Sequence, residues 1–278
     1  MDLIETQHIN ATIEDLQGNN GIGRYIFLTG SDERAKEISE NFTETEARPH
    51  PRQHNLYLGK LTVGNQSIDV AAISSGIGGP SADIVINELI LLGARRFLRI
   101  GTAGSMQPDR IHVGDLVIAT AAVRDDKASW DYIYPEYPAI ASMECLIATH
   151  RALAKTKATA HFGIVHSKSS LYAREYHYSF MEENEHYMAS MHLAGILATE
   201  MECAQLFTLS SLMSARLLRK SSHNIAIASG CILAIVGDKT SFSSDKSKVR
   251  QATVNAINLG IETVKEHFLI DQEKRHSF

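Results

Sequence analysis

Two short segments each combine an arginine with a glycine turn beside an apolar run. Residues 29–34 read Thr-Gly-Ser-Asp-Glu-Arg, and residues 99–104 read Arg-Ile-Gly-Thr-Ala-Gly. Arginine presents a rigid fork of N–H donors to an oxyanion, and the hydroxyl of Thr102 adds a further donor. Taken singly, Arg34 could be a solvated helix residue and Arg99 a structural ion pair. Taken together, they predict an oxyanion site assembled from distant parts of the chain.

A third glycine segment, Gly-Ile-Gly-Gly-Pro at residues 76–80, follows another apolar run. A turn of this kind can bring backbone N–H groups against a phosphate or a ribose at a helix N-terminus. It does not match the dinucleotide fingerprint, because the third glycine is missing and Pro80 removes an N–H. The alternative is a tight turn between a strand and a helix.

Acidic residues form two further candidate groups. Glu200 and Glu202 flank Met201, so two carboxylates could bind vicinal hydroxyls of a sugar while the thioether packs against its apolar face. The alternative is a pair of solvated acids at a helix start, where negative charge is favourable. Asp238 directly follows an apolar run and is a candidate proton donor or acceptor, because partial burial raises the pKa of a carboxyl. It could instead cap a helix.

Several classes of protein and site are disfavoured by the composition. The 27 Lys+Arg against 32 Asp+Glu give a net charge of −5, which argues against a nucleic-acid or an anionic-membrane surface. The 13 histidines include no HExxH spacing and the 3 cysteines lie far apart, so no metal site and no disulfide framework are expected. The longest nearly apolar run, residues 225–236, is too short to span a bilayer. With no signal peptide recognisable at the N-terminus, we expect a cytoplasmic protein.

The elements that must position these residues alternate between strands and helices. Apolar runs predict strands at residues 25–29, 56–63, 67–74, 97–100, 116–123, 161–166 and 225–236. Helices are predicted from Pro80 to Gly93, and near the C-terminus, where apolar residues recur at 257, 261, 264 and 268. Several strands are apolar on both faces, as in a sheet covered on both sides. We therefore predict one domain over residues 1–278, an α/β/α sandwich of three layers with a central mixed β-sheet.

In combination, these segments resemble the nucleoside phosphorylase family, and most closely its uridine phosphorylase branch. The resemblance runs from His8 to about Phe268. It is strongest in Ser-Ser-Gly-Ile-Gly-Gly-Pro-Ser at residues 74–81 and in Phe-Leu-Arg-Ile-Gly-Thr at residues 97–102. The string Glu-Met-Glu at residues 200–202 matches as well.

The resemblance implies phosphorolysis of a nucleoside, with inorganic phosphate as co-substrate and neither a cofactor nor a metal. The residues implied to bind phosphate are Gly30, Arg34, Arg99 and Thr102, joined by Arg52 of a neighbouring subunit. Those implied to bind ribose are Glu200, Met201 and Glu202, with His8 of the neighbour at the 5′-hydroxyl. Glu88 is implied to orient the phosphate arginines. A homodimer is the implied active unit and a homohexamer the common assembly.

The implied base site departs from the uridine phosphorylase pattern. Glu175 and His177 stand where the branch has Gln and Arg, and Leu171 replaces a Phe. Asp238 and Lys239 replace an Asn-Arg pair, and an Asp in the purine branch donates a proton toward N7 of the base. Arg99 and Asp238 are thus the implied catalytic groups, and Lys239 or His177 would serve a base carbonyl. A Gln at position 175 is expected to raise activity on uridine if the pocket holds uracil.

The base preference stays open between uracil, thymine and a purine. Alternatives are a purine nucleoside phosphorylase, a nucleoside hydrolase and a nucleoside-binding protein without turnover. The arginines disfavour the hydrolase, because water needs no cluster of cations.

Overall fold

Ten strands join in one mixed sheet within the part of the chain that the computed structural model describes, residues 6–221, 225–238 and 242–275. The strands are β1 (Tyr25–Thr29), β2 (Thr43–Arg48), β3 (Leu56–Val63), β4 (Gln66–Ser74), β5 (Arg96–Ser105), β6 (Leu116–Asp125), β7 (Ala139–Ile140), β8 (Ala160–Lys168), β9 (Ala198–Glu200) and β10 (Ala228–Gly237). Their order is β10-β6-β8-β9-β5-β1-β4-β3-β2, and β7 pairs with β6.

Strand β5 is the centre of this sheet because it is long enough to pair with three neighbours. Its first half pairs in parallel with β1, and its end pairs antiparallel with β9. Strand β10 runs parallel to β5 and also pairs antiparallel with β6. The strands β5, β10, β6, β8 and β9 therefore close into a ring, while β1, β4, β3 and β2 extend from it as an open sheet.

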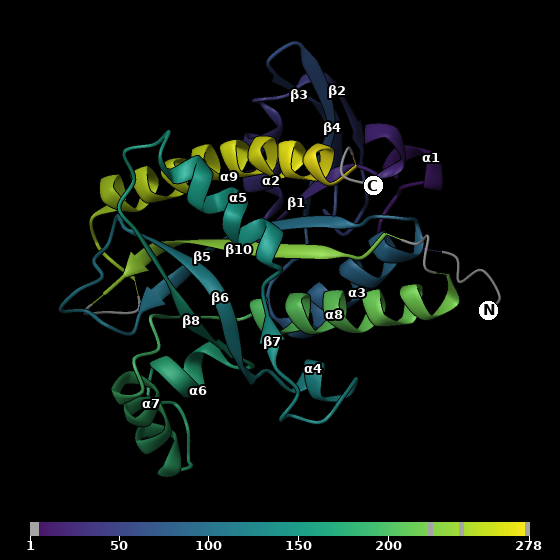
Figure 1. Cartoon of the computed structure of the whole chain (residues 1–278). Coiled ribbons are helices and arrows are strands. Elements are labelled where there is room, and N and C mark those ends of the chain that lie inside the picture. The colour runs from purple at the N-terminus through teal and green to yellow at the C-terminus, as the bar shows by residue number, and fades with distance from the viewer. Residues whose placement is uncertain (1–5, 222–224, 239–241, 276–278) are drawn as a thin grey trace.

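Helices cover both faces of the sheet (Figure 1). They are α1 (Ile13–Leu16), α2 (Asp32–Ser39), α3 (Gly79–Leu91), α4 (Lys127–Trp130), α5 (Met143–Leu153), α6 (Leu171–Glu175), α7 (Glu183–Leu193), α8 (Cys203–Lys220) and α9 (Lys246–Arg275). One apolar core lies between the sheet and helices α3 and α8, and a second lies between the sheet and helices α2, α5 and α9. The three-layer α/β/α fold predicted from the sequence is confirmed.

The burial pattern explains why the central strands read as continuous apolar runs. In β1, Ile26 and Leu28 enter the core under α3 and α8, whereas Tyr25 and Phe27 enter the core under α9. Side chains alternate between the faces of a strand, so a strand covered on both sides needs apolar residues throughout. The predicted positions of β1 and β3 match their bounds, and β5 continues beyond the predicted residues to Ser105.

The helices begin as their sequences predict. Pro80 occupies the first turn of α3, after Gly78 with its positive φ of 84°. The apolar stripe predicted near the C-terminus belongs to α9, whose residues Ile257, Ile261, Val264 and Phe268 are buried. Among the described helices, none has an apolar stretch long enough to cross a bilayer.

Candidate active site

A cavity of about 270 Å³ opens where β1, β5, β8, β9 and β10 end. Ligands in α/β folds commonly bind beyond the carboxyl ends of strands. The lining residues are Gly30, Ser31, Arg34, Ile77, Arg99, Thr102, Ala103, Gly104, Lys168, Leu171, Glu175, Thr199, Glu200, Met201, Glu202, Val236 and Phe242. Nine of the residues singled out from the sequence thus line one cavity: Gly30, Arg34, Arg99, Thr102, Leu171, Glu175, Glu200, Met201 and Glu202.

Two arginines form the cationic end of the cavity. Arg99 is buried, and its Nη2 donates to a carboxylate oxygen of Glu202. Its Nε and Nη1 are buried too, yet neither makes a hydrogen bond within the described residues. Burial, together with the positive charge of Arg99, lowers the pKa of Arg34. Nε of Arg99 also lies 3.8 Å from Oε2 of Glu200, too far for a hydrogen bond. Buried donors without hydrogen bonds beside a second cation are costly unless an anion binds, so this end is suited to an oxyanion.

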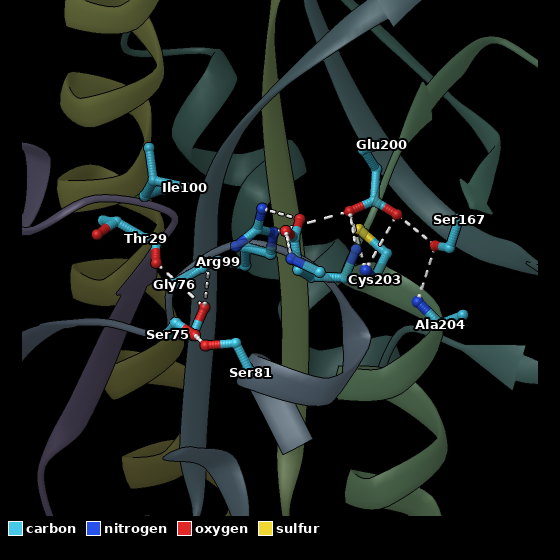
Figure 2. Close-up of polar contacts among 12 residues, drawn as sticks. Thr29, Ser75, Gly76, Ser81, Arg99, Ile100, Ser167, Glu200, Cys203 and Ala204 are labelled. Carbon is cyan, nitrogen blue, oxygen red and sulfur yellow. Dashed lines mark hydrogen bonds and ion pairs between the residues drawn. The ribbon is translucent and has the colours of Figure 1, made fainter. Parts of the chain in front are cut away.

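The glycine turn before α3 holds a carboxylate of the protein. The backbone N–H of Gly78 donates to Oε1 of Glu202 at 2.5 Å. At the base of the turn, the N–H of Ser75 donates to the carbonyl of Thr29 at 2.8 Å and the hydroxyl of Ser81 donates to the carbonyl of Ser75 at 2.7 Å (Figure 2). The turn therefore fixes Glu202 against the cavity and links β1 to α3.

Glu200 and Glu202 have different surroundings. The Glu200 carboxylate accepts from the backbone N–H groups of Glu202 and Cys203 at 2.8 and 2.9 Å, and from the hydroxyl of Ser167 (Figure 2). It therefore satisfies N–H groups at the start of α8, but both acids are buried and not solvated as the helix-start alternative supposed. Burial raises the pKa of Glu202, and the adjacent Arg99 opposes this shift. Both side chains line the cavity, and the hydrogen bond from the Glu202 backbone N–H to Glu200 fixes the two residues relative to each other.

The far end of the cavity is closed by α6. Leu171 and Glu175 lie four residues apart on this helix and both line the cavity. Arg174, on the same helix, donates two hydrogen bonds of 2.7 and 2.8 Å to the Asp125 carboxylate. This fork anchors α6 to the end of β6.

Lys168 is a cavity residue that sequence reasoning missed. The residue is 1% exposed, and its Nζ lies 2.5 Å from Oε1 of Glu175. The available signal was a lysine two residues beyond the predicted strand at residues 161–166, at the end of β8. The contact itself depends on where α6 places Glu175, which the spacing along the chain does not reveal.

Two residues expected at the base, His177 and Asp238, are not brought into the cavity. His177 follows α6 with a positive φ of 59° and forms an exposed pair with Glu185 at 3.2 Å. Asp238 accepts from the backbone N–H of Val113 at 3.1 Å and does not line the cavity. A register shift near the end of β10 precedes it, so Asp238 does not continue the face of Val236. Lys239 lies outside the described residues.

Glu88 contacts the N-terminal segment of its own chain. Its carboxylate accepts from the backbone N–H groups of residues 7, 8 and 9 at 3.0 to 3.2 Å and lies 2.8 Å from Nδ1 of His8. Within the described residues it makes no hydrogen bond to Arg34 or Arg99, so within one chain it holds the N-terminal segment and not these two arginines. Neither His8 nor Arg52 lines the cavity of its own chain.

Comparison with known proteins identifies the family. The model of the phosphorylase superfamily matches residues 24–265. The chain belongs to this superfamily. Among its relatives in the superfamily, uridine phosphorylase of Treponema pallidum is 32% identical over 91% of this chain and 92% of that protein. Uridine phosphorylase of Thermococcus kodakarensis is 31% identical over 92% of this chain and 86% of that protein.

Solved structures of the superfamily share the fold. The crystal structure of uridine phosphorylase from Vibrio fischeri superposes with a TM-score of 0.73, at 26% identity, over 96% of this chain and 99% of that one. The likeness therefore covers the sheet and the helical layers on both of its faces.

Proposed function

We propose that this member of the phosphorylase superfamily is a nucleoside phosphorylase of the uridine phosphorylase type, a pentosyltransferase. The observation that carries the proposal is the pair of buried Arg99 donors that make no hydrogen bond within the described residues, beside Arg34, in a cavity that also contains Glu202 and Met201. Relatives that are 31–32% identical over at least 91% of the chain are uridine phosphorylases.

The proposed reaction joins a phosphate oxygen to C1′ of the sugar while the bond from C1′ to the base nitrogen breaks. The electron pair of that bond leaves with the base, which is released after taking up a proton. Arg99, Arg34, Gly30 and Thr102 hold the phosphate, and Glu202 with Met201 holds the sugar. Positive charge develops on the sugar in the transition state, so an anion fixed beneath C1′ stabilises it.

A purine nucleoside is the second candidate substrate. Guanosine phosphorylase of Halorubrum lacusprofundi is 30% identical over 66% of this chain and 70% of that protein. Glu175 also favours a base that donates a hydrogen bond, because an ionised carboxylate can only accept. The position of Asp238 outside the cavity lends no support to protonation of a purine N7 by that residue.

The same proposal extends to the oligomeric state and to the cellular role of the protein. We propose a homodimer as the active unit, in which Arg52 and His8 reach the cavity of the neighbouring subunit, and a homohexamer as the full assembly. The protein would act in nucleoside salvage in the cytoplasm, with phosphate as co-substrate and with no cofactor. Among the described residues, no group of three or more His, Cys, Asp or Glu side chains is arranged to hold a metal ion.

One assay tests the proposal. The purified protein is incubated with uridine, thymidine, inosine, guanosine or adenosine, with and without phosphate, and the free base and sugar phosphate are measured. Base release that depends on phosphate is expected. Release without phosphate would identify a hydrolase, and binding without release would identify a nucleoside-binding protein.

A further inference from the structure

The loop between β2 and β3, residues 49–55, presents Arg52 to solvent. Within the described residues, the only hydrogen bond of Arg52 runs from its backbone N–H to Nδ1 of His50, at 3.2 Å. The N–H of Gln53, a residue with a positive φ of 59°, donates to the carbonyl of His50 at 2.8 Å. An exposed loop beside an edge strand has few apolar contacts, so its conformation depends on such hydrogen bonds.

Asn55 closes this loop and also ties it to a distant part of the chain. Its Oδ1 accepts the backbone N–H of His50 at 2.8 Å, which joins the two ends of the loop. Its Nδ2 donates to Oδ2 of Asp32 at 2.9 Å. A backbone N–H on one side and a carboxylate on the other leave a single orientation for the amide, and both of its ends are used.

Asp32 belongs to the segment that reaches the cationic end of the cavity. It is the first residue of α2, and Gly30 and Arg34, two residues before and after it, both line the cavity. Besides the amide of Asn55, its carboxylate accepts the hydroxyl of Tyr57 at 3.1 Å. These contacts fix the start of α2 against β3, and with it the point from which the Arg34 side chain extends.

His50 extends the same set of contacts to the N-terminal segment. Its Nε2 lies 3.2 Å from the carbonyl oxygen of Gln7, the residue before His8. A path of hydrogen bonds thus runs from Asp32 through Asn55 and His50 to Gln7. It connects one side of the chain's own cavity with the two parts of the chain that line no cavity of their own, the loop 49–55 and the segment of His8.

We propose that Asn55 is a positioning residue for phosphate in two cavities. Through Asp32 it orients the segment that carries Arg34 at the cavity of its own subunit. Through His50 it orients the loop that carries Arg52 into the cavity of the neighbouring subunit. A loop held in advance in its binding conformation loses less entropy when phosphate binds. This inference rests on the proposed phosphorylase function and on the proposed homodimer.

Two variants separate this contact from the fold around it. Asn55→Asp keeps an oxygen for the N–H of His50 but sets a carboxylate against Asp32, so only the link to α2 is lost. The KM for phosphate is expected to rise about tenfold or more, because a hydrogen bond to a charged group is replaced by two like charges. Since the contact acts on phosphate binding alone, kcat and the KM for the nucleoside are expected to stay within about twofold. The exchange Asp32→Asn with Asn55→Asp restores the hydrogen bond in the opposite direction, and the KM for phosphate is expected to return to within about twofold of the wild-type value.

Mixed oligomers show which cavity is affected. A tagged active subunit is co-expressed with a large excess of subunits silenced by Arg99→Met with Glu202→Gln, so that every active cavity has a silenced neighbour. In the first mixture the active subunit carries Asn55→Asp, and in the second the silenced subunit carries it. The reference mixture has Asn55 in both. The KM for phosphate is expected to exceed that of the reference in both mixtures, because Asn55 acts on its own cavity in the first and on its neighbour's in the second.

The outcomes separate the positioning role from the proposed function. A rise in the KM for phosphate in only one of the two mixtures would confine Asn55 to one cavity and overturn the proposal. A KM that stays high in the exchange variant would overturn it too, because the hydrogen bond is present again. In both cases the proposed phosphorylase function stands. If the wild-type protein releases no base with phosphate, it is the proposed function that fails.

A matched control lies at the other end of α2. The Nδ2 of Asn41 donates to the carbonyl oxygens of Glu37 and Ile38, at 3.2 Å each, and Asn41 does not line the cavity. Asn41→Asp makes the same chemical change and loosens the same helix, and it is expected to leave the KM for phosphate unchanged. An equal rise in this control would assign the effect to general loosening of α2 and overturn the positioning role.

Discussion

Replacing Arg99 by Met tests the anion site most directly. The variant removes the two buried donors, Nε and Nη1, that make no hydrogen bond within the described residues. A hydrogen bond to a charged group contributes about 1.5–3 kcal/mol, so the loss of two costs about 3–6 kcal/mol. Since each 1.4 kcal/mol is tenfold, kcat/KM for phosphate should fall by about 10²- to 10⁴-fold.

The assay follows phosphate-dependent base release over a range of phosphate concentrations. Thermal unfolding with and without phosphate gives a second readout, because a ligand that binds only the folded state raises Tm. Phosphate should raise the Tm of the wild-type protein and leave that of the variant unchanged.

A neighbouring arginine supplies the control. Arg96 lies on the same strand and is bound by two hydrogen bonds to Asp271, at 2.7 and 2.8 Å, and it does not line the cavity. Arg96→Met should lower stability while leaving the KM for phosphate unchanged. If Arg99→Met keeps the wild-type dependence on phosphate, the assignment of the cationic end to phosphate is refuted.

Three further predictions concern the parts that hold the site. Arg174→Leu should raise the KM for the nucleoside about tenfold without changing that for phosphate, since it releases α6 from Asp125 at a cost of about 1.5 kcal/mol; equal effects on both KM values would contradict this. Glu200→Gln should lower the free energy of unfolding in denaturant by about 1–2 kcal/mol, because the cap of α8 loses its charge; an unchanged midpoint would argue against that cap. Burial raises the pKa of Asp126 from 3.8 to about 6, so ionising this carboxyl opposes folding, a cost that is absent below about pH 4 and complete above about pH 6. Asp126→Asn should therefore match the wild-type stability at pH 4 and exceed it by about 3 kcal/mol at pH 8, as measured by urea unfolding; a gap independent of pH would refute the shift.

The sequence was sufficient to predict those elements whose pattern follows from burial alone. Strand β1 is buried at every position because both faces are covered, so its first four residues form an apolar run that is visible in the sequence. Strand β2 was missed because it lies at the sheet edge and is exposed along most of its length, so nothing in its sequence has to be apolar. Strand β9 has three residues, too few to show a period.

The site was predictable to the extent that glycine turns and short apolar runs mark its residues. Arg99 and Glu202 were found in this way, although Arg99 lies inside β5, which continues to Ser105. The side-chain directions of Asp238 and His177 depend on a register shift and on a positive φ, and neither is encoded in spacing. Lys168 shows the same limit, since its partner is fixed only when α6 packs over the cavity. The expectation that Gln at position 175 raises activity on uridine took no account of the charge of Lys168.

The two ends of the cavity differ in how freely they can change over evolutionary time. Arg99 belongs to a strand that is paired along both edges, so a new residue there disturbs the sheet. Helix α6, by contrast, has five residues, none of them buried, and one arginine fork anchors it to the end of β6. A lineage can therefore exchange Leu171, or Glu175 together with its partner Lys168, while the anion site stays intact. Descendants of one ancestor can therefore differ in the base they bind while they keep the same anion site.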